Sequence, residues 1–177
     1  MENEFPRRKH PRLKNYDYSS PGAYFITICV QKQKCILSSV SRSECEESEP
    51  SDPPAELAKI SCTKYGIVAE RELRSLETRY PYLKVDQYVI MPNHIHVILI
   101  LDNKTAGASP RPTVEDIICA YKSLTTKECK KIGLTEKLFQ TSFYEHVVRD
   151  RKDYEVHAKY IQENPLCWYY DELYAEE

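Results

Sequence analysis

Hydrophobic residues along the chain follow strand-like and helix-like patterns in turn. The alternating segments are rich in β-branched and aromatic residues and predict strands over residues 22–31, 82–92, 94–102 and 142–150. Apolar residues at helical spacing among charged ones predict helices over residues 63–80, 113–133 and 151–164. In the first helix, the residues expected on the apolar face are Ile67, Leu73 and Leu76.

Local signals predict where these elements begin and end. Thr113 is the expected N-cap of the second helix, and Asp116 three residues later predicts a capping box. Gly133 is expected just beyond its last residue. Pro165 predicts the end of the third helix, since proline lacks an N–H and clashes with the preceding turn.

The order strand–helix–strand–strand–helix–strand–helix predicts an α+β fold. The expected architecture is a ferredoxin-like or RRM-like antiparallel sheet with helices packed on one face. Residues 21–170 would form this domain, between a basic arm at residues 1–20 and a tail at residues 171–177. Residues 38–57, rich in Ser, Glu and Pro, are expected to be a mobile acidic insertion because they bury little apolar area.

Composition narrows the class of protein. The chain is 41% hydrophobic and 29% charged, which is ordinary for a globular protein, and no apolar run approaches the roughly 20 residues that span a bilayer. The first residues lack the apolar core of a signal peptide. The seven cysteines are scattered without a C-x-x-C pair, which indicates free thiols. We therefore expect a cytoplasmic protein with no membrane partner.

The net charge of −2 hides an uneven distribution. Residues 38–61 hold six acidic and two basic residues, a net charge of −4, so the rest of the chain has a net charge of +2. A basic arm precedes the first strand and would suit phosphate contacts, although a solvated tail is the alternative. The residues expected to bind nucleic acid there are Arg7, Arg8, Lys9, Arg12 and Lys14, with the aromatic residues Tyr16 and Tyr18.

Two histidines stand one residue apart in the strand "HIHVILILD". Alternation places His94 and His96 on one face, roughly 6.5–7 Å apart at Cα, where both rings can converge on a divalent cation. A hydrogen-bonded core histidine is the alternative for either one. The hydrolases with three alternating histidines are excluded, because Ile98 stands where their third histidine would be.

The third helix carries a second candidate group. At 3.6 residues per turn, His157, Tyr160 and Asn164 lie near one face. If that face packs over the histidine strand, a phenol and an amide join the two imidazoles. The alternative is that Tyr160 is one aromatic core residue among the 14 tyrosines of the chain.

Three segments together carry a family resemblance: "YDYSSPGAYFITICV", "MPNHIHVILIL" and "FYEHVVRDRKDYEVHAKYIQENPLCW". They resemble the single-tyrosine HUH transposases, in particular the REP-associated tyrosine transposases, over about residues 16–170. The resemblance implies that His94 and His96 are metal ligands and that Tyr160 is the nucleophile. It also implies that Asn164 completes the metal shell, directly or through water. His146 and Arg149 lie in a stretch typical of this family, where backbone support and phosphate contact are both open roles, and Arg149 is included among the expected DNA-binding residues.

The resemblance further implies an activity. The tyrosine would attack a phosphodiester of single-stranded DNA beside a hairpin or palindromic repeat, giving a 5′-phosphotyrosine and a free 3′-OH. Mg²⁺ or Mn²⁺ would polarise the phosphate, and no organic cofactor is expected. The protein would be a monomer or a homodimer in a bacterial cytoplasm, associated with the nucleoid when bound to DNA.

Two other functions remain open at the level of sequence. An RRM-like sheet can bind single-stranded nucleic acid without metal or catalysis. A metal phosphoesterase that hydrolyses with water would need a carboxylate base near His94, and Asp86 and Asp102 are the nearest acids in sequence.

Overall fold

The structure of the protein is a computed structural model, and it describes residues 16–43, 57–102 and 112–174. Its main sheet has four antiparallel strands in the order β4-β5-β1-β6, which is the order of a ferredoxin-like fold. The strands of this sheet are β1 (Gly22–Cys29), β4 (Leu83–Ile90), β5 (His94–Leu101) and β6 (Tyr144–Val148). The predicted α+β class and antiparallel sheet are therefore confirmed.

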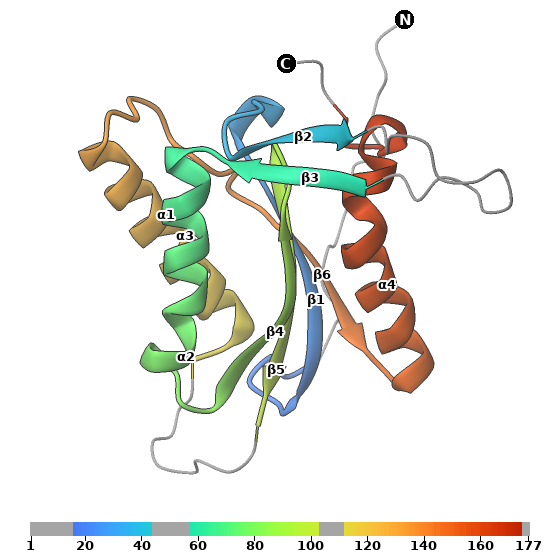
Figure 1. Cartoon of the computed structure of the whole chain (residues 1–177). Helices are drawn as coiled ribbons and strands as arrows, with labels where there is room; N and C mark the ends of the chain where they lie inside the picture. Colours follow the sequence, from blue (N-terminus) through green and yellow to red (C-terminus); the bar gives the residue numbers. More distant parts are fainter. Residues whose placement is uncertain (1–15, 44–56, 103–111, 175–177) are drawn as a thin grey trace, which may run out of the picture.

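The helices lie on both faces of this sheet (Figure 1). The first face is covered by α1 (Lys64–Arg74), α2 (Leu76–Arg79) and α3 (Val114–Lys131). On the opposite face lies α4 (Arg151–Cys167), followed by the short 3-10 helix η2 (Trp168–Tyr170). The prediction of helices on one face therefore describes α1 to α3, and α4 adds a layer on the other face.

Alternate residues of β5 face two different hydrophobic clusters. Ile95, Val97, Leu99 and Leu101 pack toward α1 and α3 in the larger cluster. Ile98 faces the smaller cluster under α4, where it meets Phe25, Ile161 and Trp168.

Residues 38–57 differ from the expected loop. Residues 38–43 form β2 (Ser38–Ser43), which pairs with β3 (Leu57–Cys62) in a two-stranded ribbon. Val40 explains the difference, because it is buried in the cluster under α4 together with Ile60 of β3. The acidic residues 44–56 lie outside the described part of the chain.

Two helices also differ from their predicted form. Helix α4 continues through Pro165 to Cys167, because Trp168, 2% exposed, anchors the end of the helix in the core. Ile67, expected on the buried face of α1, is 60% exposed, and Val68, Ala69 and Leu73 are buried instead.

The ends of α3 agree with the prediction. The capping box at its start is present, and Gly133 just beyond its end has a φ of 104°, a left-handed conformation that glycine adopts readily.

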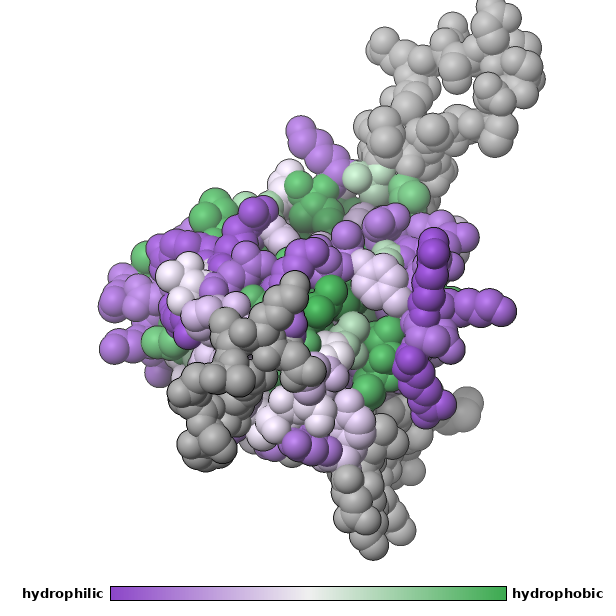
Figure 2. Space-filling view, turned by 90° about the horizontal axis from the view of Figure 1, so that it is seen from below, coloured by the Kyte–Doolittle hydropathy of each residue, from purple (hydrophilic) through white to green (hydrophobic). Residues whose placement is uncertain are grey.

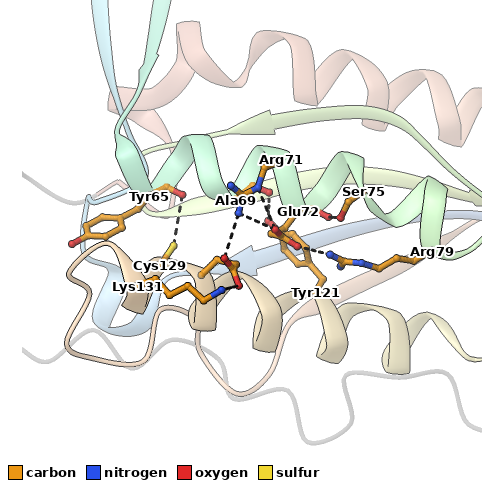
Figure 3. A network of polar contacts seen from close by, with 10 residues as sticks. Tyr65, Ala69, Arg71, Glu72, Ser75, Arg79, Tyr121, Cys129 and Lys131 are labelled. Atoms are coloured by element: carbon orange, nitrogen blue, oxygen red, sulfur yellow. Dashed lines mark hydrogen bonds and ion pairs between the residues drawn. The ribbon is translucent and has the colours of Figure 1, made fainter.

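A polar network joins α1 to α3 (Figure 3). Glu72 accepts hydrogen bonds from Arg71 and Arg79, and this pairing lowers its pKa against the opposing effect of burial. The Tyr121 hydroxyl donates to the Ala69 carbonyl at 3.1 Å. These bonds connect α1 to α2 and to α3 in the helical layer that covers this face of the sheet.

One face of the molecule is mostly polar. Figure 2 shows hydrophilic side chains over much of the face seen from below, with apolar ones in small patches between them. In the described ranges, no helix has the length and apolar character needed to cross a membrane.

Candidate metal and tyrosine site

The strand β5 presents both histidines to the layer formed by α4. His94 and His96 are 0% and 2% exposed, and their ring centroids are 4.5 Å apart. Across the sheet they pair with Cys29 and Thr27 of β1, next to the strand end where β5 begins. The common face predicted from alternation is confirmed.

Hydrogen bonds set the tautomer of His94. Its Nδ1 lies 2.8 Å from Asn93 Oδ1. The Asn93 amide is itself oriented, because its Nδ2 donates to the Leu173 carbonyl at 2.7 Å. Since an amide oxygen only accepts, Nδ1 of His94 carries the proton and Nε2 carries a lone pair.

His96 is held in a similar way. Its Nδ1 lies 2.9 Å from the Thr27 hydroxyl of the neighbouring strand. Partners of this kind orient metal-binding imidazoles and leave the other nitrogen for the ion.

Three buried atoms at this site have no hydrogen-bond partner in the described part of the chain: His94 Nε2, His96 Nε2 and Asn164 Oδ1. Unpaired buried polar atoms are costly, so the cluster suits a bound group that accepts their lone pairs. The donor set of two imidazoles and one amide oxygen fits a divalent cation. The residues present therefore fit the metal that the sequence predicts.

A carboxylate joins this group. Ligand atoms of His94, His96 and Asp171 all lie within 4.8 Å of one another. Asp171 Oδ2 accepts a hydrogen bond of 2.7 Å from Asn164 Nδ2, and its Oδ1 accepts one of 2.7 Å from the Leu173 amide. The site thus offers an anionic oxygen beside the two imidazoles.

Helix α4 brings Tyr160 to the same place within one chain. The Tyr160 ring centroid lies 5.0 Å from that of His96, edge to face, and its hydroxyl donates to Asp171 Oδ2 at 3.3 Å. The side chain is 43% exposed, while the histidines beneath it are buried. A substrate can therefore reach the phenol from solvent.

Burial and charge set the protonation states. Burial lowers the pKa of His94 to about 4, although the nearby Asp171 charge opposes it, and lowers that of His96 well below its usual value. Burial also raises the pKa of Tyr160 to about 12, and Asp171 adds to this. Near neutral pH the imidazoles are neutral and ready to bind a cation, whereas the phenol stays protonated until positive charge arrives.

Of the predicted DNA-binding residues, the structure describes Tyr16, Tyr18 and Arg149. The five basic residues of the arm are outside the described residues. Tyr16 and Tyr18 pack with Tyr24 against the core on the α3 side of the sheet, the two rings 5.0 Å apart. Arg149 lies just before α4, roughly 15 Å along the helix from Tyr160. The structure does not bring these three residues to the histidine pair.

A second polar cluster lies near the start of α4. His146 Nε2 is 2.8 Å from Asp153 Oδ2, and His157 Nδ1 donates to the Asp153 backbone carbonyl at 2.8 Å. The two imidazoles stack with centroids 4.6 Å apart. The ring of Phe25 lies against both His157 and His96, so this cluster adjoins the first site through one aromatic side chain.

Sequence reasoning missed Asp171, Asn93 and Thr27. Asp171 falls in the expected tail, and only the turn after Trp168 brings it back to the histidines. Asn93 lies between the strands expected over residues 82–92 and 94–102, and its place beside His94 in the sequence is a usable signal. Thr27 is one of many β-branched residues in β1, and only strand register identifies it.

Comparison with known proteins found several relatives in sequence, although no protein-family model matches the chain. An "Uncharacterized protein" of Haemophilus influenzae is 27% identical over 184 residues, covering 96% of this chain and 94% of that one. A protein of the same organism named "Putative REP-associated tyrosine transposase" is 28% identical over 91% of this chain and 81% of its own length. The "REP-associated tyrosine transposase" of Escherichia coli K12 is 26% identical over 62% and 59%.

A solved structure shares the fold. It is described as "Structure of the REP associates tyrosine transposase bound to a REP hairpin", with a TM-score of 0.57 and 20% identity. The match covers 88% of this chain and 72% of that chain.

Proposed function

Because this chain is a relative of the REP-associated tyrosine transposases, we propose that it is a metal-dependent endonuclease and strand transferase for single-stranded DNA. Its substrate would carry a hairpin or palindromic repeat, as does the DNA of the related solved structure. The observation that carries the proposal is the meeting of Tyr160 with His94 and His96 in one chain, at a ring distance of 5.0 Å from His96.

The metal would be held by the Nε2 atoms of His94 and His96, with oxygen from Asp171 and from Asn164. When bound, Mg²⁺ or Mn²⁺ polarises a phosphate and stabilises the charge that builds on its oxygens. The chain's own contribution is orientation: Asn93 and Thr27 hold the two rings so that both lone pairs face the site.

Tyr160 would attack the phosphorus in line. The new bond joins the phenol oxygen to phosphorus, and the bond from phosphorus to the 3′ oxygen breaks. The departing 3′ oxygen takes a proton from solvent water and leaves as a 3′-OH. The phenol must lose its proton, and Asp171 Oδ2, 3.3 Å from that hydroxyl, is the acceptor within reach. Because the phosphodiester is kept as a phosphotyrosine, a second 3′-OH can reverse the step and join strands.

Two observations bear on the other candidates. An RRM-like module stacks bases on exposed aromatic residues of its sheet, but Phe25 here is 4% exposed beneath α4. A water-using phosphoesterase needs a carboxylate at the site. Neither acid considered from the sequence is there: Asp86 bonds to Tyr154 and Lys84, and Asp102 lies at the far end of β5 from His94. The carboxylate at the site is Asp171, so a base for water is present and only the adduct test separates the two reactions.

The test is a covalent adduct. The protein is incubated with Mn²⁺ and an oligonucleotide that carries a hairpin and single-stranded flanks, labelled at either end. A 5′-phosphotyrosine retains the 3′-labelled fragment on the protein and frees the 5′-labelled one. Tyr160→Phe and His96→Ala should abolish the adduct, and Tyr170→Phe, an 83% exposed tyrosine nearby, should keep it.

Other outcomes identify the other functions. Cleavage without an adduct would indicate hydrolysis by water. Hairpin binding that survives Tyr160→Phe and His96→Ala, without cleavage under any metal condition, would indicate a binding module.

A further inference from the structure

A basic pocket of about 560 Å³ lies between α3 and the segment that follows it. Four of its nine lining residues are lysines, and none is acidic. This lysine pocket is lined by Cys119, Lys122, Ser123, Thr126, Lys127, Lys130, Lys137, Phe139 and Thr141.

Two of the lysines are fixed by neutral groups. Lys122 is 7% exposed and donates to the Thr141 carbonyl at 2.8 Å and to the Ser142 carbonyl at 3.4 Å. Lys137 donates to the Thr141 hydroxyl at 3.0 Å. These bonds orient the ammonium groups but cancel none of their charge.

The nearby acids are engaged by other cations. Glu128 pairs with Lys131 at 2.6 Å and with Arg71 of α1 at 3.8 Å, and Glu136 pairs with Lys34 at 3.0 Å. Lys127 and Lys130 stand three residues apart on one helix face, where like charges destabilise the helix unless an anion joins them. The lysine pocket is therefore built for an anionic ligand.

The pocket lies at the same end of the sheet as the metal and tyrosine site. Gln140 N donates to the Cys29 carbonyl at 2.9 Å, and Cys29 pairs with His94 on its other edge. Two strand spacings, about 10 Å, thus separate the backbone of His94 from that of Gln140, which lies between the lining residues Phe139 and Thr141. The pocket itself opens on the α3 face of the sheet. The pKa of Cys29 is raised chiefly by burial, and the charges of Asp171 and Lys122 act on it in opposite directions, which is consistent with this proximity.

We propose that the lysine pocket binds backbone phosphates of the single DNA strand where that strand leads to or from Tyr160. This inference rests on the proposed function. Lysines act on phosphates as point charges and read no sequence, which suits a strand-guiding contact. The contact would hold the strand a few nucleotides from the bond that is cut.

The test compares two double variants with the same change in net charge. Lys127→Ala with Lys130→Ala removes two pocket lysines, whereas Lys84→Ala with Lys131→Ala removes two lysines that pair with acids outside it. Both are made in full-length Tyr160→Phe protein, so that no cleavage occurs. Binding to the hairpin oligonucleotide is followed by fluorescence anisotropy at several salt concentrations.

The salt dependence gives the expected result. Each lysine that neutralises a phosphate of single-stranded DNA contributes about 0.7 to the slope of log K against log salt, so the pocket variant should have a slope smaller by roughly 1.4. The decrease should be the same for oligonucleotides of different flanking sequence. The control variant should keep the parental slope. Equal slopes for both variants would overturn the proposal.

A small phosphate ligand is the other source of the same chemistry. Inorganic pyrophosphate could raise the melting temperature of the parent protein but not that of the Lys127→Ala, Lys130→Ala variant, while both bind DNA equally. In that case the pocket binds a small anion and the proposal is wrong. The adduct assay separates this result from the main function. An adduct with an unchanged slope rejects only the pocket, whereas a changed slope without any adduct rejects the tyrosine chemistry.

Discussion

Acidification of the metal-free protein should unfold it through the buried imidazole of His94. This side chain is 0% exposed, and burial lowers its pKa from 6.5 to about 4. In the unfolded chain this imidazole is therefore protonated below about pH 6.5, whereas in the folded chain it is protonated only below about pH 4. Since the unfolded state binds more protons in this window, the free energy of unfolding falls as the pH falls.

The size of the effect follows from the shift. At 1.36 kcal/mol per pH unit, a shift from 6.5 to about 4 corresponds to a loss of about 3 kcal/mol by the low end of the window. His96, whose pKa is also lowered by burial, adds to this loss. A domain of this size is stabilised by roughly 5–15 kcal/mol, so the loss is a large part of the total.

The measurement is urea unfolding with a chelator present, at steps between pH 7.5 and pH 4.5. His94→Asn is the control, because its amide can still donate to Asn93 Oδ1 while it removes the titrating group. The variant should show a shallower dependence of unfolding free energy on pH. Histidine NMR titration gives an independent measurement, and at least one imidazole should titrate far below 6.

Two results would refute this reasoning. One is the same pH dependence in the wild-type protein and in His94→Asn. The other is an NMR titration in which every histidine has an ordinary pKa. Saturating Mn²⁺ should make the unfolding free energy of the wild-type protein depend more steeply on pH. A metal at 100 times its Kd adds about 2.7 kcal/mol of stability, and this is lost when the ligands are protonated.

Three further substitutions test other parts of the structure. Gly66→Ala should destabilise the protein by about 3 kcal/mol in urea unfolding, because the new Cβ would lie 2.0 Å from the Leu37 carbonyl oxygen; a neutral effect would contradict this packing. Thr113→Ala should cost about 1 kcal/mol through loss of its bond to the Asp116 amide, and an unchanged urea midpoint would disprove the cap. Thr27→Val should weaken Mn²⁺ binding about tenfold in calorimetry by releasing the second histidine of the pair, and an unchanged Kd would show that this contact does not orient the ring.

Local pattern identified most of the elements. The period of two along β5 placed Ile95 and Val97 on one face and His94 and His96 on the other, and the structure confirms both. Helical spacing on α4 placed Tyr160 on the face that meets the histidines. These predictions succeed because side-chain direction depends only on the backbone period of one element.

The predictions that failed depend on contacts between distant segments. Nothing local marks Val40 as buried, so the sequence predicts a loop there; the strand forms because Val40 packs in the core under α4. Pro165 is a helix-ending signal that was overridden because Trp168 is buried beyond it. In both cases tertiary burial outweighs local propensity.

The sequence alone determined which groups could do the chemistry: two imidazoles on one strand face, and a phenol and an amide one helical turn apart. Tertiary structure decided what surrounds them. The turn after η2 returns Asp171 to within 4.8 Å of the histidines, and strand pairing sets Thr27 beside His96. Spacing along a chain fixes directions within an element, but the distance between elements depends on how the whole core packs.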